Sequence, residues 1–460
     1  MDKKKKFRLV DAVLMSVVVV LVVESTASSA AIGPSQFFWW IFLLICFFLP
    51  YGLISSELGT TYDGEGGLYD WVKKAYGRRA GGRVAWYYWI NYPIWMVSLA
   101  ILFTDTGAQI FGLEANSIVV VLIQLIFVWV VCLVSLSKIS DAKWILNSAA
   151  FMKAFIMLSL GGLGIYTAIN HGVANEFTLQ TMTPTFDSSS LAFLSVLIFN
   201  FMGFEVVASM APEMDNPQRD IPKALVLGGS LIALFYMVGA FGMSAAIPVS
   251  EISPDAGLLD SFSALTTSNI FIIIIGLMFM YTLASNLISW AYGVNYVAMY
   301  CAEDGALPKI FAKRLKSNDM PLGAVLVNGV MASVLILIIP FIDNQDIFWS
   351  FFALNVVTLL ASYLYMFPAF LKLRKVDPTT ERPFRVKGSD GFLKLITFMP
   401  FVLIILTVIL TLIPLPDLIS GGPAAFMEAI PGYIPLILGS IAAFICGEVI
   451  VSKCIKKGEK

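Results

Sequence analysis

Long apolar stretches separated by short polar segments run through the whole 460-residue chain. A bilayer core about 30 Å thick needs roughly 20 helical residues, and backbone groups in lipid must be satisfied within the helix. Each apolar stretch therefore predicts a membrane-spanning helix. We expect twelve, at residues 9–32, 36–59, 84–111, 117–136, 145–168, 189–212, 224–247, 269–300, 321–341, 346–371, 394–414 and 430–452.

Basic residues follow this pattern closely. With the N-terminus inside, the inner segments hold 29 of the 30 Lys and Arg residues, and the predicted outer loops hold none. Cytoplasmic loops of membrane proteins carry such an excess of positive charge. The alternation predicts an even number of spans in the cell (plasma) membrane, with both termini in the cytosol. The remaining cation, Lys153, lies inside the fifth span.

Composition narrows the class of protein further. Only 13% of residues are charged and the mean hydropathy is +0.83, whereas a soluble protein carries roughly 25% charged residues. The polar connections are short, so we expect one all-α membrane domain over residues 1–460. The absence of a soluble head or a Walker lysine motif in the sequence argues against a sensor kinase or a nucleotide-driven pump. We expect the lipid bilayer and a small molecule as partners, in a monomer or a homodimer, and no nucleic acid.

Cysteine and histidine do not suggest a metal site. None of the five cysteines falls in a predicted outer loop, which predicts no structural disulfide, and their spacing fits no metal cluster. His171 is the single histidine and cannot form a catalytic triad or a zinc site alone. We therefore expect no metal, no cofactor and no enzymatic activity. The apolar sequence after Lys3–Lys6 lacks a small-residue cleavage site, so we expect no cleavable signal peptide.

Ionisable residues inside predicted spans are costly and are functional candidates for that reason. Glu24, Asp105, Lys153 and Glu205 lie within spans. Asp11 and Glu57 lie near span ends, where an interfacial role is expected. For Lys153 two interpretations stand: a structural pair with Glu24 or Glu205, or an ammonium that takes the place of a sodium ion.

Two spans carry interruptions at corresponding positions. Glu24 is followed by the small and hydroxyl residues 25–33, and span six reads Asn-Phe-Met-Gly-Phe-Glu at 200–205. Spans one and six each begin a group of five. Matching interruptions in two halves of a transporter indicate its central binding site; the alternative is close helix packing through small residues. Most span aromatics are expected to pack or to form an interfacial belt.

Four motifs then occur in order at the inner ends of spans. They are the glycine-rich Asp63–Val72, the segment Glu213–Ala224 close to E-x-x-N-P-x-R-x-x-P-x-A, the segment Ala302–Pro308, and Arg382–Val386 with its R-P-F sequence. Together they resemble the amino acid–polyamine–organocation superfamily over nearly the whole chain.

The resemblance implies a LeuT-like fold. Residues 1–168 and 189–371 would form two inverted five-helix repeats with helices one and six broken, and 394–452 would add two helices. Glu205 matches the glutamate that binds substrate and gates in arginine–agmatine antiporters. Trp290 lies fifteen residues before Gly305, as their span-eight tryptophan does. Lys153 resembles the span-five lysine of sodium-independent members.

One departure bears on the substrate. Many relatives have a G-S-G break in span one, which holds a substrate carboxylate, whereas this chain reads Val-Glu-Ser-Thr-Ala-Ser-Ser at 23–29. A carboxylate there repels carboxylates and attracts amines. Glutamate:GABA antiporters also have a glutamate in this region, so the chain resembles both branches.

We therefore expect a sodium-independent antiporter of small cationic amines such as agmatine and putrescine. Three buried carboxylates, Glu24, Asp105 and Glu205, would face one ammonium. The alternatives are a glutamate:GABA or other amino acid exchanger, and a non-transporting receptor on a transporter fold. The expected substrate contacts are Glu24, Ser25, Thr26, Gly203, Phe204, Glu205 and Trp290, with Lys153 as the sodium substitute and Asp105, Tyr92 and Asn286 as further candidates.

Overall fold

The computed structural model describes residues 8–62, 66–112, 117–184, 191, 194–208, 216–253, 257–341 and 347–458, and within them every regular element is a helix. Motif residues Asp63–Glu65 and Glu213–Asp215 lie outside the described part. The α-helices are α1 (Leu9–Val20), α2 (Thr26–Ala30), α3 (Gln36–Leu43), α4 (Leu49–Thr61), α5 (Leu68–Tyr76), α6 (Arg78–Phe111), α7 (Ser117–Ser135), α8 (Ile139–Asn170), α9 (Leu179–Met182), α11 (Leu194–Phe199), α12 (Phe204–Ala208), α13 (Pro217–Ala246), α14 (Gly257–Leu265), α15 (Asn269–Glu303), α16 (Leu322–Ile338), α17 (Ile347–Tyr363), α18 (Met366–Val376), α19 (Asp390–Leu412) and α20 (Leu415–Gly458).

Five short helical pieces of the described chain link these helices or continue them. They are η1 (Val23–Ser25), the π-helical η2 (Leu44–Phe48) that joins α3 to α4, η4 (Val249–Glu251), η5 (Lys309–Ala312) and η6 (Ile339–Phe341). Helix α20 bends at Gly422.

Nine helical stretches of the described chain are long and apolar enough to cross a membrane. The bent pair 9–20 and 23–30 makes a tenth. The twelve-span count stays a prediction, because residues 390–456 form one 67-residue stretch and 194–207 is shorter than a span. Side chains such as Ile118, Ile169 and Leu438 point outward, 59–79% exposed. Such apolar exterior is normal only where lipid is the solvent.

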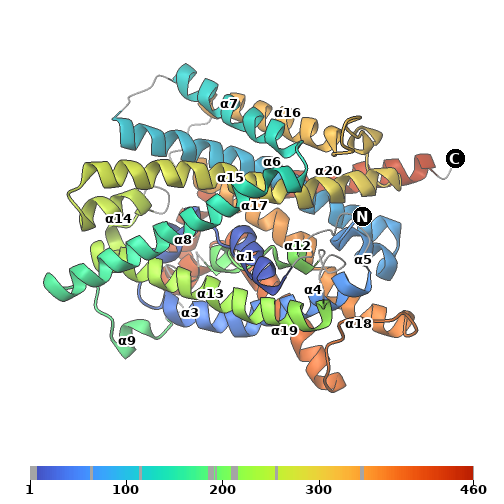
Figure 1. The fold of residues 1–460 in the computed structure, drawn as a ribbon, viewed down its shortest axis with the longest axis horizontal. Coiled ribbons are helices and arrows are strands. Elements are labelled where there is room, and N and C mark those ends of the chain that lie inside the picture. Colours follow the sequence, from blue (N-terminus) through green and yellow to red (C-terminus); the bar gives the residue numbers. More distant parts are fainter. Residues whose placement is uncertain are drawn as a thin grey trace.

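The molecule has two distinct ends in the long direction of the view (Figure 1). Helices α5 and α18 and the C-terminal end of α20 lie at one end, on the right. Helices α9 and α14 lie at the other, on the left. The connections near α5 and α18 are those that carry clustered basic residues in the sequence, so the charge asymmetry is also a spatial one.

Helix α1 lies near the middle of the view (Figure 1), and its second half is buried among other helices. It packs against α13, α8, α12 and α15, and its residues from Ser16 to Val20 are buried. The first span bends by 47° between residues 20 and 23. The second interruption lies at 200–203, between α11 and α12. Both interruptions are therefore inside the protein rather than at its lipid surface.

Candidate functional site

The backbone at the end of α1 is satisfied by side chains from three other helices. Lys153 of α8 donates to the carbonyls of Val18 (2.8 Å) and Leu21 (2.5 Å). The Trp290 indole of α15 donates to Val19 (3.1 Å), and the Tyr236 hydroxyl of α13 donates to Val20 (3.3 Å). Carbonyls at a helix end have no intrahelical partner, and water is scarce at this depth. These side chains thus make the break stable.

Lys153 and Glu24 meet through an amide. The ammonium donates its third bond to Asn286 Oδ1 at 2.6 Å, and Asn286 Nδ2 donates to Glu24 Oε1 at 2.7 Å. An ammonium has three protons, and these three contacts use all of them. Glu24 is 3% exposed, and its Oε2 has no hydrogen-bond partner among the described residues.

Glu205 is held by three phenols from three helices. Tyr88 of α6 and Tyr363 of α17 donate to Oε1, at 2.8 and 2.5 Å, and Tyr51 of α4 donates to Oε2. The Tyr51 oxygen also accepts from the backbone N–H groups of Gly203 and Glu205. The carboxylate therefore joins the start of α12 to α4, α6 and α17, and Tyr51 fixes the break in front of it.

Trp290 lies between these two clusters. Its ring packs edge-to-face on Trp95 and lies 6.4 Å, centroid to centroid, from Tyr88. A Cβ added to Gly203 would lie 3.1 Å from the Trp290 ring and 2.8 Å from Val19. Gly203 also has a φ of +109°, which L side chains rarely adopt. Glycine is thus required where the two broken helices approach each other.

The remaining sequence candidates lie in the same interior. The Ser25 hydroxyl is 2.5 Å from Asn200 Oδ1, so the two breaks touch directly. Thr26 contacts the Met157 sulfur at 3.6 Å. Tyr92 donates to the Leu287 carbonyl at 2.8 Å and thereby braces α15 beside Asn286. Phe204 is fully buried and packs edge-to-face on Phe48.

Asp105 does not belong to this group. It is exposed and lines a surface pocket with Gln109, Leu258 and Phe279, where α6, α14 and α15 meet. The expectation of three buried carboxylates is therefore wrong for Asp105. The apolar neighbours of Asp105 hid the reason, which is that its side chain lies on the outward face of α6, between the buried residues Thr104 and Thr106.

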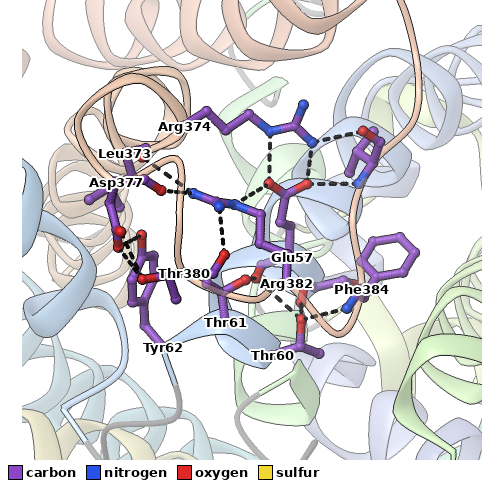
Figure 2. A network of polar contacts seen from close by, with 12 residues as sticks. Glu57, Thr60, Thr61, Tyr62, Leu373, Arg374, Asp377, Thr380, Arg382 and Phe384 are labelled. Atoms are coloured by element: carbon purple, nitrogen blue, oxygen red, sulfur yellow. Dashed lines mark hydrogen bonds and ion pairs between the residues drawn. The ribbon is translucent and has the colours of Figure 1, made fainter.

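Glu57 lies near the end of α4, and its side chain is buried within the protein. Figure 2 shows its carboxylate between two guanidinium groups. Arg374 of α18 donates to both oxygens, Arg382 lies 3.3 Å from Oε1, and the backbone N–H of Val386 donates to Oε2 at 2.7 Å. The R-P-F segment folds over the end of α4, which a local reading of span two could not reveal.

The same segment also closes the end of α18. Arg382 donates to the carbonyls of Leu373, Asp377 and Thr380, so it neutralises the negative end of that helix. Tyr62 and Thr380 donate to the Asp377 carboxylate (Figure 2). These hydroxyls, Thr380 first, hold the pKa of Asp377 below its usual value. These hydrogen bonds and ion pairs together connect the end of α4 to α18 and the segment after it.

Sequence reasoning missed the phenols Tyr51, Tyr236 and Tyr363, and treated Tyr88 as a packing aromatic. Each lies in an apolar stretch and looks like a space-filling residue there. One property of the sequence pointed to them. A buried Tyr hydroxyl needs a hydrogen-bond partner, and the two buried carboxylates and the backbone groups at the two breaks also needed hydrogen bonds.

Comparison with known proteins identifies the family of this chain. The amino acid permease family model matches residues 7–435. A probable agmatine/putrescine antiporter of Lactococcus lactis subsp. lactis is 49% identical, over 98% of this chain and 95% of that protein. A glutamate/gamma-aminobutyrate antiporter of the same organism is 23% identical, over 80% of this chain and 76% of that protein. An uncharacterised transporter of Legionella pneumophila is 28% identical, over 81% of this chain and 82% of that protein. The chain is therefore a multi-pass membrane transporter that belongs to the amino acid permease family.

Proposed function

We propose that this protein exchanges small cationic amines, of the agmatine and putrescine class, across the cell membrane. The observation that carries the proposal is the Glu24 carboxylate. It is buried beside a helix break, and one of its oxygens has no hydrogen-bond donor in the described part of the chain. An uncompensated buried charge costs several kcal/mol. An ammonium or guanidinium group would supply the missing donor and the missing charge.

The local charge balance supports a cationic substrate. Glu24 and Glu205 are both buried near the two breaks. The buried ammonium of Lys153 is linked to Glu24 only through the Asn286 amide, and Glu205 is bonded to neutral phenols. Arg374 and Arg382 are already engaged by Glu57. The central site therefore has room for one more positive charge. The name of the 49% identical relative points to the same substrate class.

Lys153 supports independence from sodium. Carbonyls of an unwound helix coordinate sodium in coupled transporters, and here the Val18 and Leu21 carbonyls accept from an ammonium that the chain itself provides. We assign Lys153 the role of that ion. Glu24 binds the substrate's charged group, Glu205 and its three phenols gate the path, and Trp290 covers the substrate by a cation–π contact.

The proposal includes an architecture and an orientation. Twelve spans form two inverted five-helix repeats, at 1–168 and 189–371, followed by two more helices. The basic end with α5 and α18 faces the cytosol, together with both termini, in agreement with the lysine and arginine bias of the connections.

The test is counterflow into sodium-free proteoliposomes preloaded with unlabelled putrescine, with labelled agmatine outside. We expect saturable uptake that needs internal putrescine and does not change when sodium is added. Liposomes without internal amine are the control. Exchange of glutamate against gamma-aminobutyrate without any amine exchange would replace this proposal with the amino acid antiporter suggested by the 23% identical relative.

A further inference from the structure

Among the described residues, Asn286 is the side chain that bonds to both charged groups beside the first break. It is 1% exposed, and it lies in the middle of α15 with Lys153 on one side and Glu24 on the other. The neighbouring backbone is braced by the Tyr92 hydroxyl on the Leu287 carbonyl. The amide is thus fixed in place before any substrate arrives.

The chemistry of Lys153 dictates which way this amide points. An ammonium only donates, so Asn286 must present Oδ1 to it. The NH₂ group then has to face Glu24, and it donates to Oε1. A reversed amide would set NH₂ against an ammonium and a carbonyl oxygen against a carboxylate. Lys153 therefore orients Asn286, and Asn286 orients Glu24.

This arrangement has a consequence for the two Glu24 oxygens. Oε1 is occupied by the amide, whereas Oε2 is buried without a donor from the described residues. The amide also keeps the carboxylate and the ammonium from forming a direct ion pair, since all three Lys153 protons go elsewhere. A direct pair would neutralise Glu24 and remove its attraction for a second cation.

We propose that Asn286 is the positioning residue that makes the site selective for a cationic amine. It holds Glu24 by one oxygen and leaves the other oxygen as the acceptor for the substrate's ammonium or guanidinium group. This inference rests on the proposed amine exchange and adds the residue that determines its charge selectivity.

The test compares two substitutions in proteoliposomes. In Asn286→Asp the new carboxylate still accepts from Lys153 but repels Glu24. At about pH 7.5 we expect the agmatine KM to rise about tenfold, as for loss of a hydrogen bond to a charged group. Two adjoining carboxylates take up one shared proton as the pH falls. A protonated Asp can donate to Glu24 as the amide does, so at about pH 5.5 most of the lost affinity should return.

The polar groups nearest to this pair on the packed helices are Lys153 on α8, Tyr236 on α13 and the Trp290 indole on α15, which are bonded to the α1 backbone. On α12, which also packs against α1, the Glu205 carboxylate is held by three phenols. Asn286→Ser keeps a small polar group but cannot titrate. We expect the same rise in KM at both pH values, without recovery. It also serves as the second variant if the Asp form does not fold.

Asn295→Asp is the matched control. Asn295 is equally buried on the same helix, but its amide oxygen accepts from Asn328 and has no part in the Lys153–Glu24 contact. It should keep the wild-type KM at both pH values. An Asn286→Asp protein with wild-type KM, or one with lower kcat but unchanged KM and no recovery at low pH, would overturn the inference alone. A wild-type protein that exchanges no amine would overturn the proposed function and this substrate assignment with it.

Discussion

Glu57 and Glu24 are both buried carboxylates on central helices, and their surroundings differ sharply. Glu57 receives two guanidinium groups and a backbone N–H, which leaves neither oxygen free (Figure 2). Glu24 receives one amide, on one oxygen, and reaches its nearest cation only through that amide. The first joins α4 to the segment after α18, and the second lies where the backbone of the first span is broken.

The difference separates structural charge from functional charge. A buried carboxylate costs free energy unless it is paired and hydrogen-bonded. The ion pairs and hydrogen bonds of Glu57 offset this free energy within the protein, and they stabilise the contact between α4 and the segment after α18. Glu24 lacks a direct ion pair, so a cation that neutralises it has to come from outside the protein. A binding site for a cation needs this property. Glu205 lies between these extremes, because three neutral phenols satisfy it without neutralising it.

The largest effect is expected at the structural carboxylate. Glu57→Gln should lower the free energy of unfolding by about 3–5 kcal/mol, because Arg374 and Arg382 keep their buried charges without the counter-ion. Unfolding of the purified protein in detergent measures this. Glu381→Gln, on the exposed part of the same connection, should leave stability unchanged. Equal stability of the two variants would mean that the ion pairs of Glu57 contribute nothing to the stability of the fold.

Glu24→Gln should behave in the opposite way. We expect little loss of stability, since an amide replaces a carboxylate that is incompletely paired, and about a thirtyfold rise in agmatine KM, which corresponds to about 2 kcal/mol for a charged hydrogen bond. Counterflow kinetics measure the KM, and Glu251→Gln at an exposed position is the control. Wild-type amine uptake by Glu24→Gln would remove this carboxylate from the substrate site.

The phenols around Glu205 allow a graded test. Tyr51→Phe removes three hydrogen bonds and should destabilise the protein by about 2–3 kcal/mol, whereas Tyr363→Phe removes one and should cost about 1 kcal/mol. The same detergent unfolding assay ranks them. If the order were reversed, Tyr51 would not be the residue that fixes the break at Gly203.

The smallest effect is expected at Asp105. Because its side chain is exposed, Asp105→Asn should change stability by less than about 0.5 kcal/mol and the agmatine KM by less than about twofold. Counterflow measures the KM and unfolding in detergent measures the stability, both on the same purified preparation. A large rise in the agmatine KM would mean that Asp105 does contact the substrate, for example at the entrance to the central site.

Local pattern was enough to predict much of this molecule. Hydropathy located the long helices, and the small and polar residues at 23–33 and 200–205 located the breaks. Lys153 and Glu205 stood out because charge is rare in apolar stretches. Their partners could not be predicted in the same way. Tyr51, Tyr236 and Tyr363 are unremarkable in their own segments, and only the packing of distant helices brings them to the charges and to the broken backbone.

What the sequence did not reveal has the same origin. Glu57 was expected near a span end, but the segment more than 300 residues later that covers it could not be predicted locally. Asp105 was expected inside because its neighbours are apolar, but its side chain lies on the outward face of α6. Trp290 was expected to cover a substrate; its indole N–H is bonded to Val19, and the role of its ring face stays a prediction.

The free oxygen of Glu24 also bears on transport kinetics. Without substrate, the carrier would have to switch between its two orientations with an uncompensated negative charge in a medium of low dielectric constant, whereas the loaded carrier switches with that charge balanced. The empty return step should therefore be slow and the loaded one fast. Efflux of labelled amine into amine-free buffer, compared with efflux into buffer containing amine, measures the two rates. A slow empty return makes one-for-one exchange the natural mode of such a protein, because each substrate leaving the site must be replaced before the carrier can turn back.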